Sequence, residues 1–106
     1  MQRQAALTEK EITYQIRSVL KAFGIFHWKV MQGLGCVPGI PDILGIQKGT
    51  GKLIAIEVKT AKGKTTRFQD NFINWINEAG GIAFVARSAD DVIEKLNLNK
   101  RTLIND

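Results

Sequence analysis

Cysteine and histidine are almost absent from this chain of 106 residues, which contains one of each, Cys36 and His27. A single cysteine excludes an intramolecular disulfide and any paired-cysteine metal site, and it is typical of a reducing compartment. No apolar run reaches the roughly 18 residues that a transmembrane helix requires, and the N-terminus shows no signal-peptide pattern. These absences predict a soluble, intracellular protein without membrane association.

Acidic residues are also in deficit, because 10 Asp and Glu stand against 15 Lys and Arg, a formal charge of +5. A basic excess favours a polyanionic partner such as nucleic acid, although a plain solvated surface explains the charge equally well. The length predicts one domain over residues 1–106, with a core at about 8–97. Because so short a chain buries a small share of its surface, a homodimer is expected.

Hydrophobic periodicity and turn residues predict seven elements. They are a helix at 9–23, strands at 25–31, 42–46 and 53–60, a helix at 67–79, a strand at 82–86 and a helix at 89–96. This order predicts an α/β fold in which helices flank a mixed four-stranded sheet. The buried stripe predicted for the second helix consists of Phe68, Phe72, Trp75, Ile76 and Ala79.

The third predicted strand carries a carboxylate and an ammonium on one face. Side chains alternate with period two along a strand, so Glu57 and Lys59 share a face, about 7 Å apart. The opposite face is apolar and predicts a core: Ile54, Ile56 and Val58. Taken alone, the pair also fits an exposed strand face with an ordinary ion pair.

Asp42 favours a functional site over an ordinary ion pair. It follows Pro41 directly ahead of a short apolar strand. Such an aspartate is often a turn or strand-entry residue. If its strand pairs with residues 53–60, however, Asp42 can lie beside Glu57. Two adjacent carboxylates repel each other unless a cation sits between them, and oxygen ligands favour Mg²⁺ or Mn²⁺ over zinc.

The first helix offers two further acids, Glu9 and Glu11. With Ile12 at 0° and about 100° per residue, Glu9 lies near +60°, inside the apolar arc, and Glu11 near −100°, outside it. Glu11 also forms a capping box with Thr8. Glu9 is therefore the better candidate for the site, although a first-turn acid that complements the helix dipole remains the alternative.

Gln69, His27 and Cys36 also carry side chains with the chemistry to act in a site. Gln69 can reach a phosphate or a catalytic water, and equally it can be the capping-box partner of Thr66. His27 is interpreted as a polar residue on a strand face, and Cys36, in a glycine-rich loop, as lacking a catalytic role. A basic cluster surrounds the entry to the second helix, where DNA phosphates could also meet free backbone amides; the alternative is that these residues serve solubility alone: Lys62, Lys64 and Arg67.

Together these motifs resemble the PD-(D/E)xK nucleases and, more narrowly, the VRR-NUC (virus-type replication-repair nuclease) family. The likeness covers about 8–97 and rests on Glu9, Gly39-Ile40-Pro41-Asp42, Glu57-Val58-Lys59, Gln69, the pair Trp28-Lys29 and Gly80-Gly81. This chain has Lys29 where many relatives carry Arg. The resemblance implies a restriction-endonuclease-like αβββαβ core, here followed by a C-terminal helix.

The same resemblance implies the roles of individual residues. Glu9, Asp42, Glu57 and the Val58 carbonyl would bind Mg²⁺ or Mn²⁺, while Lys59 would activate water or stabilise developing charge. Gln69 matches the glutamine of the family's helix, and Lys29 is a candidate DNA contact. The implied enzyme is a homodimer that cuts branched DNA such as four-way (Holliday) junctions. A less selective nickase, a restriction-type nuclease and a non-catalytic nucleic-acid-binding module remain alternatives.

Overall fold

A four-stranded mixed sheet forms the centre of the computed structural model, which describes residues 6–99. β1 (His27–Lys29), β2 (Ile43–Ile46) and β3 (Leu53–Val58) are antiparallel neighbours. β4 (Ile82–Ala86) lies parallel to β3, and the helix between these strands provides the crossover that a parallel pair requires. The strand order is β1-β2-β3-β4, which confirms the predicted fold class.

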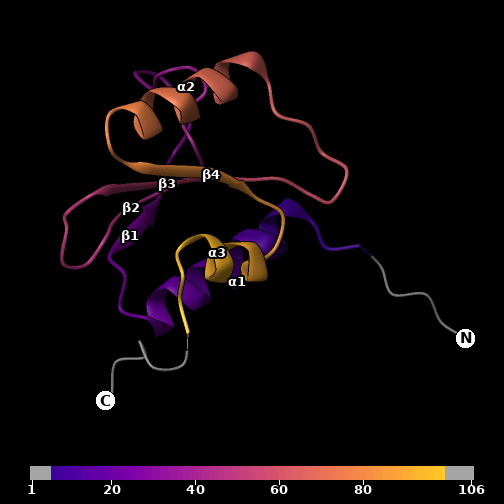
Figure 1. The fold of residues 1–106 in the computed structure, drawn as a ribbon. Helices are drawn as coiled ribbons and strands as arrows, with labels where there is room; N and C mark the ends of the chain where they lie inside the picture. Colours follow the sequence, from indigo (N-terminus) through magenta and orange to yellow (C-terminus); the bar gives the residue numbers. More distant parts are fainter. Residues whose placement is uncertain (1–5, 100–106) are drawn as a thin grey trace, which may run out of the picture.

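Helices cover both faces of this sheet (Figure 1). α1 (Glu9–Ala22) and α3 (Ala89–Lys95) pack on one face, and α2 (Arg67–Glu78) lies on the other. The main core forms between the sheet and the α1–α3 layer, from inward side chains such as Ile16, Leu20, Ile43, Ile56, Val58 and Val92. Within residues 6–99, none of the helices is long and apolar enough to cross a bilayer.

Strand ends differ from the prediction where backbone hydrogen bonds are used elsewhere. The first strand begins at His27 rather than at residue 25, because the amide of Ile25 donates to the carbonyl of Leu20 at the end of α1. β3 ends at Val58, although the amide of Lys59 still donates to the carbonyl of Ala86. The pairing therefore reaches the last residue of the predicted motif.

The buried stripe predicted for α2 was wrong at Phe68, Trp75 and Ala79, all of which are exposed. Phe68 and Trp75 are each 62% exposed, and Ile76 is the buried residue of this helix. The helix rests on Ala55 and Ala83, two small side chains that form only a narrow apolar contact with it. Nothing among residues 6–99 covers its outer side, so part of its apolar stripe stays in solvent.

Both long helices begin with a reciprocal capping box, as their sequences predict. Thr8 caps α1 together with Glu11, which leaves Glu9 free of that task. Thr66 caps α2 together with Gln69 in the same way. Each box satisfies two backbone amides that the first turn leaves without helical partners.

Gly39, in the loop before β2, lies directly against the first turn of α2. Its φ is +84°, and a Cβ at this position would overlap the carbonyl of Phe68 and approach the amide nitrogen of Gln69 to 2.9 Å. A side chain is therefore excluded both by backbone conformation and by close packing. This contact locks the loop that carries Asp42 onto the helix that carries Gln69.

We expect Gly39→Ala to lower the melting temperature by about 10 °C or more, because it adds a backbone overlap to the strain of a positive φ. Gly49→Ala is the matched control, since Gly49 has φ +85° but open space where the Cβ would be. The control should cost about 5 °C from strain alone. Thermal circular dichroism measures both, and equal shifts would show that the loop contact is unimportant.

Candidate active site

Glu57 is the one charged side chain of residues 6–99 that is fully buried, at 2% exposure. It points toward α2, together with Ala55, whereas Ile56 and Val58 point into the main core. Lys59 shares its face, and the Lys59 Nζ lies 3.6 Å from Glu57 Oε2. The predicted shared face is confirmed, and the ion pair is enclosed rather than exposed.

Asp42 lies at the next position of the strand ladder. β2 and β3 pair Ile43 with Ile56, so one further step of the register sets Asp42 opposite Glu57. The Asp42 Oδ2 accepts a hydrogen bond of 2.8 Å from the amide of Val58. Because the N–H and C=O of one strand residue face the same neighbouring strand, the Val58 carbonyl also faces the Asp42 side.

Gln69 is the capping-box partner of Thr66, and it also contacts Glu57, whereas its contact with a phosphate or a catalytic water stays a prediction. Its Oε1 accepts from the amide of Thr66, which closes the cap of α2, and its Nε2 donates to Glu57 Oε2 at 3.0 Å. One carboxamide therefore ties the start of α2 to the buried carboxylate on β3. The cap also orients the amide, since only its nitrogen is left to meet Glu57.

The two oxygens of Glu57 have different surroundings. Oε2 receives both Gln69 and Lys59. Oε1 is buried without a hydrogen-bond partner among the described residues. A buried, unpartnered carboxylate oxygen is costly, and a divalent cation is the partner that two neighbouring carboxylates favour. Asp42 and Glu57 therefore fit a magnesium-type ion, although within residues 6–99 no third Asp, Glu, His or Cys joins them.

The pKa of Glu57 also reflects the excess of negative charge at this site. Burial, together with the nearby negative charge of Asp42, raises this pKa from 4.5 to about 8, and the Lys59 ammonium opposes the rise only in part. In the metal-free protein the carboxyl group therefore holds a proton at neutral pH. A cation at Oε1 would replace that proton.

Glu9 and Lys29 lie on the α1 side of the same region. Both are exposed, and both line an open groove of about 1390 Å³ that runs between α1 and β1 and also includes Asp42. Glu57 and Lys59 do not line this groove. The half-buried Asp42 is therefore the residue through which the groove meets the buried carboxylate of Glu57. His27 is half-buried on the groove face of β1, as the strand alternation predicts.

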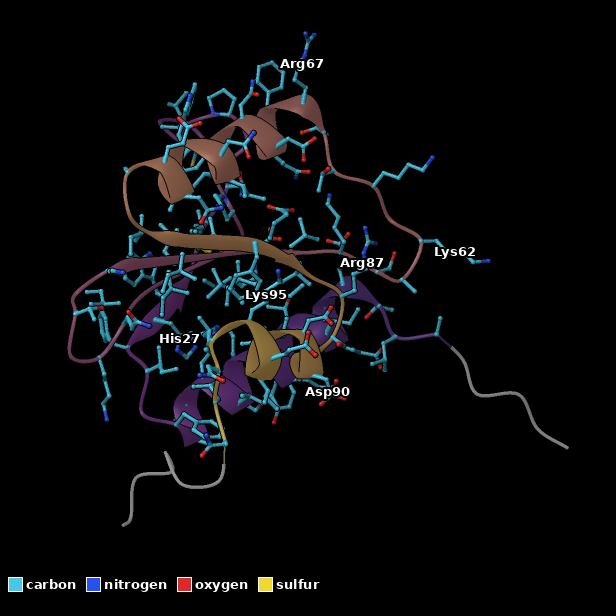
Figure 2. The ribbon with its side chains drawn as sticks, in the orientation of Figure 1. His27, Lys62, Arg67, Arg87, Asp90 and Lys95 are labelled. Carbon is cyan, nitrogen blue, oxygen red and sulfur yellow. The ribbon has the colours of Figure 1, made fainter. Side chains whose placement is uncertain are left out.

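Arg87, a residue that the sequence analysis did not single out, holds the loop after Lys59. Its Nη1 donates to the carbonyls of Thr60 and Gly63 at 2.7 Å and of Ala61 at 3.3 Å. Figure 2 shows Arg87 at the end of β4, close to the loop that presents Lys62. No local sequence pattern marks this role, because it depends on the parallel pairing of Val58 with Ala86, which brings the next residues of both strands together.

The basic cluster predicted at the entry to α2 is exposed. Lys62 and Lys64 lie on the β3–α2 loop and Arg67 begins the helix, and all three side chains are open to solvent. In Figure 2, Arg67 projects upward from the start of α2 and Lys62 projects to the right from the loop. A contact with DNA stays a prediction for these residues.

An αβββαβ core that carries Asp42, Glu57 and Lys59 at adjacent strand ends has the architecture of a PD-(D/E)xK nuclease. The model of the VRR-NUC domain family matches residues 4–90, and the chain belongs to this family. The family is one of PD-(D/E)xK-type nucleases, which act on DNA and generally use divalent metal ions.

Solved structures of the same family share this fold. One, described as a VRR_NUC domain protein, superposes with a TM-score of 0.73 at 22% identity and covers 92% of each chain. Another, described as a VRR_NUC domain, has a TM-score of 0.68 at 23% identity and covers 84% of this chain and 94% of its own. The sequence has no significant match among proteins of curated function.

The raised pKa of Glu57 predicts a pH-dependent stability in the absence of metal. Its unfolded-state pKa is 4.5 and its folded-state pKa about 8. The contribution of the protonated group is therefore complete below pH 4.5 and is lost as the pH rises through 8. Glu57→Gln cannot titrate, so wild type should lose more than about 1 kcal/mol relative to this variant between pH 6 and pH 9.

Urea denaturation in EDTA measures this difference, and the variant cancels the titration of all other groups. Addition of Mg²⁺ at the higher pH should then stabilise wild type but not Glu57→Gln. Identical pH profiles for the two proteins would contradict the burial and pairing described for Glu57.

Loss of the Arg87 guanidinium should loosen the loop after Lys59 without unfolding the sheet. Each charged hydrogen bond contributes about 1.5 kcal/mol or more, so Arg87→Gln should raise exchange of the Gly63 amide, which donates to the carbonyl of Thr60, by about tenfold or more. Amides within β3 should stay protected and serve as the internal control. Exchange at Gly63 equal to that of wild type would show that Arg87 does not hold the loop.

Proposed function

We propose that this protein is a Mg²⁺- or Mn²⁺-dependent endonuclease that hydrolyses phosphodiester bonds in branched DNA, four-way junctions included. The observation that carries the proposal is the buried Glu57, whose Oε1 has no hydrogen-bond partner among the described residues and whose neighbour is Asp42. A structural ion pair would not require a second carboxylate beside it. The pair is explained if a divalent cation is held there during the reaction.

In this proposal, Asp42, Glu57 and the Val58 carbonyl hold the ion. Glu9 is the proposed third acid, because it lines the same groove as Asp42. A divalent cation at this position supplies Lewis-acid polarisation of the scissile phosphate and lowers the pKa of a water. Gln69 holds Glu57 Oε2, so that Oε1 stays available.

Lys59 supplies the positive charge that the reaction needs at the phosphate. Its side chain is only 13% exposed, so solvent screens its charge less than it screens that of a surface lysine. As negative charge develops on the pentacoordinate phosphorus, a fixed ammonium stabilises it without reorganising. Glu57 keeps this ammonium in place across 3.6 Å.

The proposed enzyme acts as a homodimer. Apolar side chains that a monomer leaves in solvent support this state, chiefly Phe26, Met31, Leu34, Val37, Phe68 and Trp75. A large exposed apolar surface is typical of a protein–protein interface. Two active sites related by symmetry also suit a junction that presents two equivalent strands.

We expect wild type to nick a four-way junction at paired, symmetric positions in Mg²⁺ or Mn²⁺. Flap, duplex and single-stranded DNA of the same sequence should be cut at least about tenfold more slowly. Denaturing electrophoresis of end-labelled strands measures all four substrates. Uniform degradation of the four would overturn the branched-DNA proposal in favour of a less selective nuclease, and no cleavage of any would leave a binding module.

The matched variants for that assay are Asp42→Asn and Lys59→Ala. Both should abolish cleavage, because each removes a charge that the reaction requires, and both should leave junction binding in EDTA within about threefold of wild type. Circular dichroism should show folded protein for each. Unfolding of both variants, with binding and cleavage lost together, would contradict a catalytic assignment.

A further inference from the structure

The groove between α1 and β1 is basic over most of its length. It is lined by four cations, Lys10, Arg17, Lys21 and Lys29, while both of its acids, Glu9 and Asp42, are the candidate metal ligands named above. Among residues 6–99, none of these cations has a carboxylate within salt-bridge distance. Their charge is therefore available to a ligand.

Three of the cations form a row along α1. At about 100° per residue, Lys10, Arg17 and Lys21 fall within about 40° of one another around the helix axis. The helix rises about 1.5 Å per residue, so the stretch from Glu9 to Lys21 is about 18 Å long. That length equals the rise of about five nucleotides of one strand in a duplex.

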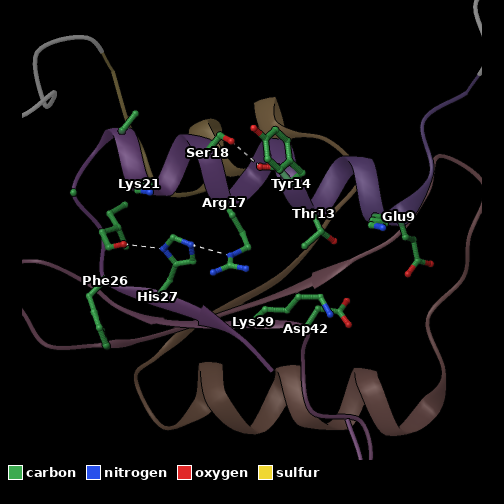
Figure 3. Close-up of a pocket in the computed structure, with 14 residues that line it drawn as sticks. Glu9, Thr13, Tyr14, Arg17, Ser18, Lys21, Phe26, His27, Lys29 and Asp42 are labelled. Carbon is green, nitrogen blue, oxygen red and sulfur yellow. Dashed lines mark hydrogen bonds between the residues drawn. The ribbon is translucent and has the colours of Figure 1, made fainter. Parts of the chain in front are cut away.

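Arg17 is held in position rather than free in solvent. Its Nε donates to His27 Nε2 at 3.3 Å. The His27 Nδ1 lies 2.9 Å from the carbonyl of Ile25, so it carries the proton and donates to that oxygen while Nε2 accepts. Figure 3 shows this chain of two hydrogen bonds, with the guanidinium extending from α1 across the groove toward the sheet.

The terminal amino groups of Arg17 are left for a ligand. Only its Nε is used within the described part of the chain. A planar guanidinium whose orientation is already fixed can bind two phosphate oxygens at once and loses little entropy in doing so. His27 is therefore a positioning residue that acts through Arg17.

We propose that this groove binds one strand of the DNA substrate by its phosphates and leads it to Asp42, with Arg17 as the principal phosphate ligand. The proposal deepens the endonuclease function and rests on it. It differs from the basic cluster at the entry to α2, which lies across the sheet from the groove (Figures 1 and 2). The groove would thus select for a strand that enters along α1.

The test is binding of a labelled four-way junction and a labelled duplex in EDTA, by fluorescence anisotropy across a salt series. Arg17→Gln should weaken binding by about tenfold in low salt and reduce the slope of log Kd against log salt by about one. Lys95→Gln is the matched control, because Lys95 lies on α3 outside the groove. It should change the affinity by less than about twofold.

Two variants distinguish the effect of a fixed guanidinium orientation from the effect of positive charge alone. His27→Ala and Arg17→Lys both retain the positive charge, so the salt slope should stay that of wild type, yet affinity should fall by about threefold or more. Thermal melts confirm that each variant is folded. Equal effects of Arg17→Gln and Lys95→Gln would overturn the groove, and wild-type affinity of both His27→Ala and Arg17→Lys would overturn the role of the fixed guanidinium.

These binding measurements need no cleavage, so they test the groove independently of the endonuclease activity. Arg17-dependent binding by a protein that cuts nothing would overturn the endonuclease alone. Normal junction cleavage together with Arg17-independent binding would overturn the groove alone.

Discussion

The buried carboxylate of Glu57 is the constraint on which the rest of this structure depends. Burying an ionised carboxylate is unfavourable unless opposite charge and hydrogen bonds compensate it. Lys59 and Gln69 both approach Oε2, whereas Oε1 has no partner among the described residues and Asp42 adds a second negative charge nearby. Two carboxylates and one ammonium leave a local deficit of positive charge. A proton relieves it in the metal-free protein, and a divalent cation would relieve it in the active one.

Several elements of the fold converge on that carboxylate. The register of β2 on β3 sets Asp42 opposite it, and the capping box of α2 aims Gln69 at it. Gly39 lets the loop before β2 pack against the first turn of α2, and Arg87 holds the loop that follows Lys59. These contacts come from β2, α2, the loop before β2 and the end of β4, so the site is assembled by tertiary structure rather than by any one segment.

Local patterns predicted the seven elements and the shared face of Glu57 and Lys59, because strand alternation and capping boxes are set by neighbouring residues. They did not show that this face is covered by α2, since periodicity does not reveal which side of a strand a later helix will cover. The stripe of α2 was wrong at Trp75 for a related reason: the extent of an apolar arc that is buried depends on the surface it meets. The contact of Arg17 with His27 joins α1 to β1 across a groove and has no local signature.

If Asp42 and Glu57 form a divalent-cation site, a crystal of the protein soaked in Mn²⁺ should hold manganese between them. Anomalous scattering locates manganese independently of the electron density around it. The proposed metal site predicts a peak bonded to Asp42 and to Glu57 Oε1, with the Lys59 ammonium remaining on Oε2. Manganese found only at surface carboxylates, such as those of Asp90 and Asp91 on α3, with Glu57 unbound, would contradict it.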